Sequence, residues 1–335
     1  MVSPAKVLLI PDAYGWAWHY MAKGIAAYAT EPYHVEVAFP LDVAPLGTNH
    51  MLGRLFGTVM QFSLAEGDFP LNWSLRDGSL VDHAGWFWTY DDSPYIAQRL
   101  TSKLRNRKML LKKASRCDVL LVKNQTHLRK LRKLAIEAVY VPPAVDTAVF
   151  TFQEPRDDDK LVVGWCGQVP EEGEHNQKGY YEVLLPLVDR FRKRNSNVRF
   201  LVNRRGAGDA FDQHTMARWY AHCDVFLCTS MDEGGPMPVL EAMACGRPVI
   251  STKCGFVPDV VRDGETGWLL DQWWSQVDAH FLVQQLDTLI SELACDLNLV
   301  RDAGEEAARD VRENWSWRQH ANTWLAAMTG VSDDG

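Results

Sequence analysis

The sequence lacks the features that mark membrane and secreted proteins. No apolar run reaches the length of about 18 residues that a membrane-spanning helix requires. The N-terminus contains one short apolar run, with neither the basic segment nor the cleavage site of a signal peptide. The sequence therefore predicts a cytoplasmic protein without a transmembrane segment.

Cysteine pairs and metal-binding patterns are also missing. The seven cysteines are an odd number, no two form a Cys-x-x-Cys motif, and most fall in or beside apolar runs. Reduced thiols are therefore expected. Two acidic runs, Asp91-Asp92 and Asp157-Asp158-Asp159, suggest a metal, but no cluster of His and Asp has ligand spacing. We expect no metal ion.

The chain has 335 residues, of which 47% are hydrophobic, enough for two domains. Short apolar runs alternate with helix-compatible segments, which predicts α/β domains with parallel sheets covered on both sides. The polar segment 153–160 resembles a linker between two such halves. Expected strands are 7–10, 34–39, 119–122, 139–141, 161–165, 198–202, 225–227 and 248–251, and expected helices are 18–28, 126–134 and 180–194.

Charge is unevenly distributed behind a net charge of −8. Residues 1–150 hold 17 Lys and Arg against 13 Asp and Glu, whereas the remainder holds 18 against 30. Within 102–133, 12 basic residues face a single acidic residue, Asp118. This block is either a pair of solvated helix faces or a surface for an anionic partner held by the first half.

The most informative segment is 233–250, which reads EGGPMPVLEAMACGRPVI. Two carboxylates, Glu233 and Glu241, flank a Gly-Gly-Pro turn and the start of an apolar helix. A glycine-rich turn entering a helix presents backbone N–H groups to a diphosphate. Carboxylates accept hydrogen bonds from the hydroxyls of sugar and ribose. This pattern favours a nucleotide-sugar site.

The segment resembles the Glu-x7-Glu donor site of retaining nucleotide-sugar glycosyltransferases of family 4, which have the GT-B fold. Further matching segments extend the resemblance over residues 140–270. It implies two Rossmann-like domains facing a cleft. These are an N-terminal acceptor domain (1–150), a C-terminal nucleotide-sugar donor domain (151–314), and a tail helix (315–335) that crosses back to the first domain.

The resemblance assigns roles within the Glu-x7-Glu segment. Glu233 would act beside the donor sugar and bind its hydroxyls. Gly234, Gly235 and Met237 would line the turn that meets sugar and phosphate. Glu241 would bind the ribose hydroxyls. Pro236 has no N–H group, so one amide contact of the family is expected to be lost.

Lys178 resembles the lysine of the family that neutralises the donor diphosphate as it leaves. The family usually places an arginine, as a second cation, at the position held here by Gln168. That second cation is either missing or supplied from elsewhere, for example by Arg204 or Arg205.

The first half matches the family poorly. Gly15 is the only glycine in the first strand-to-helix turn, so it is expected to allow close backbone approach to the donor. Asp91 aligns with a family histidine that faces the reacting sugar, and His83 and His19 are the alternatives. Four tryptophans are candidates for stacking on sugar rings, although core packing is the commoner role. They are Trp16, Trp18, Trp86 and Trp88.

The predicted function is transfer of a sugar from a nucleotide-sugar to an acceptor hydroxyl, with retention of configuration and without a cofactor or metal. The nucleotide-sugar is the donor substrate. An anionic acceptor is expected, and lipid-linked phosphate, anionic glycan, membrane surface and nucleic acid are the candidates. A membrane acceptor would place the protein peripherally at the membrane.

Two alternatives remain open. The basic block would suit an enzyme acting on a modified DNA base, but the net negative charge argues against it. The other alternative is a catalytically silent nucleotide-sugar-binding protein.

Overall fold

The computed structural model describes residues 5–11, 17–39, 58–61, 83–87, 119–133, 135–169, 177–194, 196–205, 212–231, 233–273 and 275–330. The described residues form two compact units. One unit contains the described residues between 5 and 144 and those of 317–330, and the other contains the described residues between 145 and 316.

The first unit is built on a parallel sheet with the strand order β2-β1-β3-β4-β5-β6. All four apolar residues at the end of β1 are buried, as expected for a strand covered on both faces. Its elements before the last helix are β1 (Ala5–Ile10), α1 (Ala17–Tyr28), β2 (Tyr33–Val37), β3 (Thr58–Gln61), β4 (His83–Phe87), β5 (Val119–Val122), α6 (Gln125–Lys133) and β6 (Val139–Tyr140).

The last helix, α13 (Trp317–Thr329), packs within this first unit against α1. A Cβ atom on Gly24 of α1 would lie 2.3 Å from Trp317 Cδ1, so only glycine permits this approach. Trp324 Nε1 donates to the carbonyl of Pro142 at 2.8 Å. The helix begins at Trp317 rather than Trp315, because Trp315 forms the C-cap of the preceding helix.

The second unit is built on a parallel sheet with the strand order β11-β10-β9-β7-β8. Its strands are β7 (Leu161–Gln168), β8 (Val198–Arg205), β9 (Val225–Cys228), β10 (Val249–Thr252) and β11 (Gly267–Leu270). Its helical elements are η2 (Tyr180–Leu184), α7 (Leu185–Lys193), α8 (Gln213–Tyr220), α9 (Met237–Ala244), α10 (Val257–Val260), α11 (Gln276–Leu293) and α12 (Leu297–Asn314).

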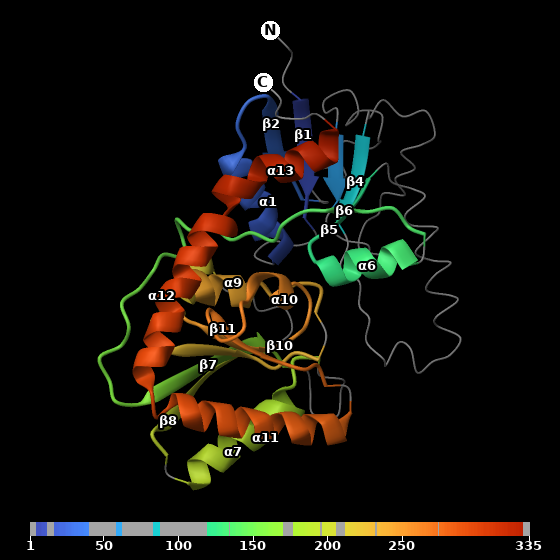
Figure 1. The fold of residues 1–335 in the computed structure, drawn as a ribbon. Helices are drawn as coiled ribbons and strands as arrows, with labels where there is room; N and C mark the ends of the chain where they lie inside the picture. The colour runs from blue at the N-terminus through green and yellow to red at the C-terminus, as the bar shows by residue number, and fades with distance from the viewer. Residues whose placement is uncertain are drawn as a thin grey trace. The chain divides into compact units, whose positions relative to one another are not determined.

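Helices cover both faces of this second sheet, in three layers (Figure 1). Along β9, Val225 and Leu227 enter the core shared with α7 and α11. Phe226 and Cys228 enter the core shared with α8, α9 and α12. Side chains of a strand alternate between the two faces of the sheet. Because both faces are covered by helices, every residue of β9 is apolar.

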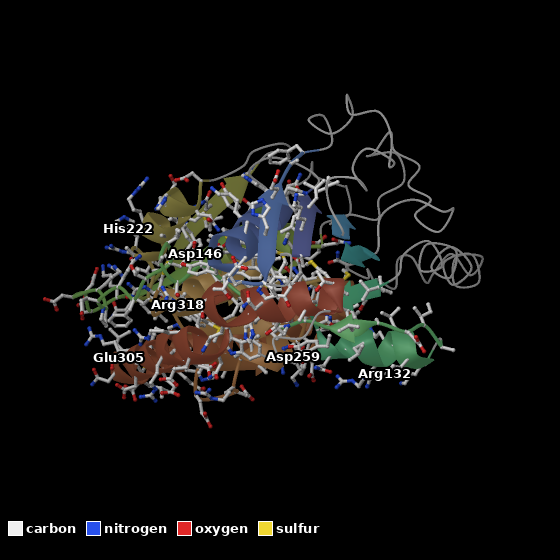
Figure 2. All side chains as sticks on the ribbon, turned by 90° about the horizontal axis from the view of Figure 1, so that it is seen from above. Arg132, Asp146, His222, Asp259, Glu305 and Arg318 are labelled. Carbon is white, nitrogen blue, oxygen red and sulfur yellow. The ribbon has the colours of Figure 1, made fainter. Side chains whose placement is uncertain are left out.

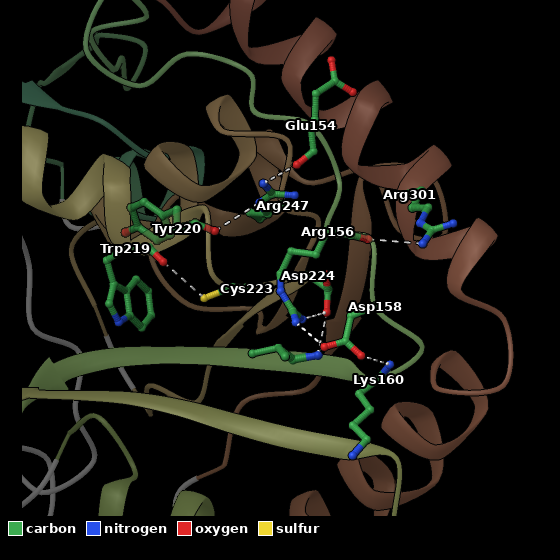
Figure 3. Close-up of polar contacts among 11 residues, drawn as sticks. Glu154, Arg156, Asp158, Lys160, Trp219, Tyr220, Cys223, Asp224, Arg247 and Arg301 are labelled. Carbon is green, nitrogen blue, oxygen red and sulfur yellow. Dashed lines mark hydrogen bonds and ion pairs between the residues drawn. The ribbon is translucent and has the colours of Figure 1, made fainter.

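The predicted linker 153–160 is held to the second unit by polar contacts (Figure 3). Arg156 Nη1 donates to Asp224 Oδ2 at 2.9 Å. The side chain of Arg247 is 2% exposed, and its Nη2 donates to the carbonyl of Glu154 at 3.1 Å. These arginines already contact carboxylate and carbonyl oxygens, so we assign them to the stability of this unit.

Several expected elements have shifted ends. α6 begins at Gln125 because Asn124 caps it, with Oδ1 accepting from the His127 N–H at 2.6 Å. The single helix expected over 180–194 starts instead as the π-helical turn η2 before α7. β8 continues three residues beyond its expected end, to Arg205.

Candidate functional site

The candidate site lies where the strand order of the second sheet reverses. β7 has β8 on one side and β9 on the other, although β8 and β9 follow it in sequence. In open α/β sheets, ligands bind at the carboxyl ends of the strands at such a switch point. The segments that follow β7 and β9 carry Lys178 and Glu233 respectively.

Lys178 and Glu233 form an ion pair between Nζ and Oε1. Ser230 Oγ donates to the same Glu233 oxygen at 3.1 Å. Burial, the largest single influence, opposes the charged form of Lys178. The charge and hydrogen bond of Glu233, together with smaller effects of Cys228 and Cys166, outweigh it, so the pKa of Lys178 is raised. The structure therefore brings together two predicted residues that are 55 positions apart in sequence.

The backbone of Lys178 is fixed by Thr229, at the end of β9. Thr229 Oγ1 donates to the Lys178 carbonyl at 2.6 Å and accepts from Trp165 Nε1 at 2.9 Å. The Met231 N–H donates to the Gln177 carbonyl at 2.7 Å. Because Thr229 is 1% exposed, this hydroxyl is a buried clamp between the two segments.

Gly179 allows the chain to turn directly after Lys178. Its φ of +68° is in the left-handed region, and a Cβ atom there would lie 2.7 Å from the Thr229 carbonyl oxygen. The N–H groups of Val183 and Leu184 then both donate to the Gly179 carbonyl, at 3.0 and 2.9 Å. Such π-helical turns are frequent at functional sites.

The Gly234-Gly235 turn packs against Gly255, which follows β10. Gly255 has a φ of +54°, and a Cβ atom on it would lie 2.8 Å from the Glu233 carbonyl oxygen and 3.0 Å from the Gly235 nitrogen. The turn leads into α9, whose first residue is Met237. Pro236, at the N-cap position, provides no side-chain cap. Gly255 therefore fixes the entrance to α9.

Glu241 lies on α9 and is held by Tyr220 of α8. The Tyr220 hydroxyl donates to Glu241 Oε2 at 3.0 Å. Burial and the Glu241 carboxylate raise the pKa of Tyr220 well above its ordinary value. The phenol therefore remains a hydrogen-bond donor. It fixes the rotamer of Glu241, the residue predicted to bind the ribose.

Other predicted residues lie outside the described residues or belong to the first unit. Gly15 and Asp91 lie outside the described residues, as do Trp16 and Trp88 and the side chains of Trp18 and Trp86. His83 is the first residue of β4 in the first unit.

His19 lies in α1 of the first unit and is 5% exposed. Its ring centroid lies 5.1 Å from those of Tyr20 and Phe39. Burial, with a smaller effect of Lys23, lowers the pKa of His19. These contacts are those of a core residue.

Two negative findings apply to the described part of the chain. There, no three His, Cys, Asp or Glu side chains gather closely enough to hold a metal ion. None of the helices in these ranges combines the length and the apolarity needed to cross a bilayer.

The sequence did not predict the parts played by Tyr220, Thr229 and Ser230. All three fall within a segment that resembles the family, but their partners come from other elements. Only the adjacency of β7 and β9 places Thr229 beside Lys178. The signal available in the sequence was a polar Thr-Ser pair directly after a buried strand.

Comparison with known families identifies the second unit. Residues 160–292 match the family model described as Glycosyl transferases group 1. This segment belongs to the group 1 glycosyltransferases. It contains Lys178, Glu233 and Glu241 together with the switch point of the sheet. For these residues, the family predicted from the Glu-x7-Glu motif is confirmed.

Curated relatives match part of this chain. The D-inositol 3-phosphate glycosyltransferase of Paenarthrobacter aurescens is 33% identical over 120 residues, which is 35% of this chain and 27% of the relative. The MMP alpha-(1->4)-mannosyltransferase of Mycolicibacterium hassiacum is 26% identical over 200 residues, 56% of this chain and 46% of the relative. The chain spans less than half the length of both relatives.

Solved structures match nearly the whole chain. HepE of Anabaena, in complex with UDP and glucose, has a TM-score of 0.68 and 12% identity, covering 98% of this chain and 100% of that chain. Sucrose-phosphate synthase from Thermosynechococcus elongatus has a TM-score of 0.66 and 15% identity, covering 96% and 97%. At these identities the likeness shows the fold, and the predicted α/β GT-B fold is confirmed.

Proposed function

We propose that this chain is a retaining glycosyltransferase that moves a sugar from a nucleotide-sugar to an acceptor hydroxyl without a metal ion. The observation that carries the proposal is the Lys178–Glu233 ion pair at the switch point, inside the group 1 segment. HepE, which has the same fold, was solved with UDP and glucose. That complex supports a sugar linked to a nucleoside diphosphate as the donor.

The proposed chemistry depends on charge placed beside the leaving group. As the bond between the anomeric carbon and the diphosphate oxygen breaks, negative charge grows on the diphosphate. Lys178 and the N-terminal turn of α9 would stabilise that charge. Glu233 would bind sugar hydroxyls, and Glu241, held by Tyr220, would bind the ribose.

The acceptor would attack from the face that the diphosphate leaves. The acceptor oxygen then forms the new bond to the anomeric carbon, and its proton passes to the departing diphosphate. The configuration is retained, and no protein side chain serves as nucleophile. The contribution of the protein is to position the two substrates and to stabilise charge.

Release of nucleoside diphosphate from UDP-, GDP- and ADP-hexoses, measured with a panel of acceptors, tests the activity. Proton NMR of the product reports whether the anomeric configuration is kept. Transfer with retention is expected. Binding of a nucleotide-sugar without transfer to any acceptor would instead favour the catalytically silent alternative, and an inverted product would contradict the mechanism.

We also propose that the acceptor, or the surface that carries it, is anionic and is bound by the first unit. Three cations on α6, Arg129, Arg132 and Lys133, are exposed, while Leu128 and Leu131 on the same helix are buried. Figure 2 shows Arg132 projecting outward from α6. The basic residues at 103–116 lie outside the described residues.

An anionic lipid surface is the favoured source of this charge, since each basic residue near such a membrane contributes about 1 kcal/mol. Co-sedimentation with vesicles containing anionic phospholipid, over a salt series, is expected to show binding that Arg129→Gln/Arg132→Gln/Lys133→Gln weakens. The control changes Arg192, Lys193 and Arg218, exposed cations of the second unit, to Gln. If the protein does not bind vesicles but shifts duplex DNA in a gel, the nucleic-acid alternative is favoured. Binding to neither would make α6 a solvated face.

A further inference from the structure

The Lys178 charge is already balanced by Glu233 in the described structure. The two side chains form an ion pair, so together they contribute no net charge to the site. A nucleotide-sugar diphosphate carries two negative charges. At Gln168, where the family usually has an arginine, the side chain is uncharged and exposed. A second cation is therefore needed, and the sheet shows where one lies.

Arg204 lies on the same face of the sheet as Lys178. In the pairing of β7 with β8, Arg204 is opposite Gly167. A Cβ atom on Gly167 would lie 3.4 Å from Lys178 Cγ and 2.8 Å from Trp165 Cη2, so this face of β7 is the one that Lys178 covers. Residues opposite one another in a sheet project from the same face.

The alternation along β8 leads to the same face. Phe200 and Val202 pack into the core that contains Trp165 and Tyr180. Side chains on one face of a strand recur every two residues, so Arg204 follows Phe200 and Val202 on this face. It lies at the carboxyl end of β8. Asn203, which lies between Val202 and Arg204 in sequence, instead contacts Met216. Met216 belongs to the core on the opposite face of the sheet.

The guanidinium of Arg204 is held by Tyr180, two residues after Lys178. Its carbon lies 5.2 Å from the centroid of the Tyr180 ring, and Nη1 donates to the Tyr180 hydroxyl at 3.3 Å. The Tyr180 ring in turn packs 5.5 Å from Trp165. Within the ranges that the structure describes, Arg204 contacts no carboxylate. It is an exposed cation in a fixed orientation.

We propose that Arg204 supplies the second positive charge that binds the donor diphosphate, in place of the arginine that the family carries at position 168. The inference rests on the proposed function, because it names a ligand of the same donor site. A planar guanidinium donates two parallel hydrogen bonds to phosphate oxygens, which an ammonium does not. Stacking on Tyr180 lowers the entropy that Arg204 would lose on binding.

Calorimetric titration of the full chain with UDP, GDP and ADP, and with uridine, guanosine and adenosine, tests this role. For the nucleotide that the wild type prefers, Arg204→Gln is expected to lower diphosphate affinity about 10-fold or more and to leave nucleoside affinity unchanged. Arg204→Lys, which keeps the charge, should lose less. The control is Arg199→Gln, an exposed arginine near the beginning of β8, which should change neither affinity.

Restoring the family residue provides the sharpest comparison. Gln168→Arg in the Arg204→Gln background is expected to recover diphosphate affinity. Failure to recover it would contradict the proposal that Arg204 takes the role of an arginine at position 168. Unchanged diphosphate affinity in Arg204→Gln, or an equal loss for diphosphate and nucleoside, would overturn the inference. If the wild type binds none of the three diphosphates, the proposed function itself fails, so the two failures are distinguishable.

Discussion

Thr229 donates its hydroxyl hydrogen bond to the backbone carbonyl of Lys178, at 2.6 Å. The same hydroxyl accepts from Trp165 Nε1, so one buried side chain joins three segments of the second unit. Lys178 therefore receives its position from β9, although it follows β7 in sequence. The predictions below follow from this arrangement and from the ion pair with Glu233.

Thr229→Val removes the hydroxyl and keeps the shape of the side chain. The Lys178 carbonyl and Trp165 Nε1 then each lose a partner, a loss of about 1–3 kcal/mol per buried group. We expect a lower free energy of unfolding in urea and a lower kcat. Thr229→Ser keeps the hydroxyl and is expected to restore both, and a Thr229→Val protein with wild-type kcat would contradict the clamp.

Gly255→Ala is expected to displace the Glu233 turn. The added Cβ atom would lie 2.8 Å from the Glu233 carbonyl oxygen. Gly264→Ala is a matched control, because Gly264 also has a positive φ, +78°. Among the described residues, no atom beyond its chain neighbours lies within 4 Å of the added Cβ. Both substitutions should cost about 1 kcal/mol of backbone strain. Only Gly255→Ala should weaken donor binding in titrations, and equal effects would argue against a role for Gly255 at the site.

The ion pair of Lys178 is expected to be insensitive to pH in the neutral range. The pKa of Lys178 is raised above its ordinary value of 10.5. Burial lowers it, but the charge and hydrogen bond of Glu233, with smaller effects of Cys228 and Cys166, together exceed the effect of burial. A raised lysine pKa contributes stability that is complete below the pKa of the unfolded chain, about 10.4, and is lost only as pH rises through the folded value. The stability difference between wild type and Lys178→Met in urea should therefore be constant from pH 7 to pH 9. A difference that shrinks over this range would count against a charged, paired lysine.

Transfer should persist in excess EDTA. In the proposed mechanism, Lys178 and the N-terminal turn of α9 stabilise the leaving diphosphate, a task that a divalent cation performs in other enzymes. The measurement is nucleoside diphosphate release with and without chelator. Complete loss of release that Mg²⁺ or Mn²⁺ restores would overturn the metal-independent mechanism.

The motifs of the second unit could be predicted from the sequence better than the contacts that their residues make. Lys178, Glu233 and Glu241 lie in local motifs whose spacing is preserved, so the family could be identified from them. The hydrogen bonds of Thr229 and Tyr220 could not be predicted, because they join residues 51 and 21 positions apart through strand order and helix packing. The sequence offers both Arg204 and Arg205 as candidates for a second cation, and the pairing of Arg204 with Gly167 is the structural observation that favours Arg204.

Local details were also beyond the sequence. η2 and α7 share one apolar period, which favours a single helix. The left-handed Gly179 that starts the π-helical turn gives no distinct pattern in the sequence. Strands β3 and β4 were not predicted, since Thr58–Gln61 and His83–Phe87 are short and mix polar with apolar residues. The division into acceptor and donor domains, and the roles of Gly15 and Asp91, stay predictions.

The most direct test of the central claim is binding of a nucleotide-sugar at Lys178. Thermal unfolding of wild type, Lys178→Ala and Lys193→Ala would be followed with UDP-, GDP- and ADP-sugars. Lys193 is a matched control, an exposed lysine ion-paired with Asp189 on α7. A ligand at 100 times its Kd stabilises a protein by about 2.7 kcal/mol.

We predict that at least one of these donors raises the Tm of wild type and Lys193→Ala, and raises that of Lys178→Ala much less. Turnover of Lys178→Ala with that donor should fall about 10²-fold, as when one preorganised charge is removed. If no donor stabilises the wild type, or if Lys178→Ala is stabilised and turns over like the wild type, the donor site is not the one described.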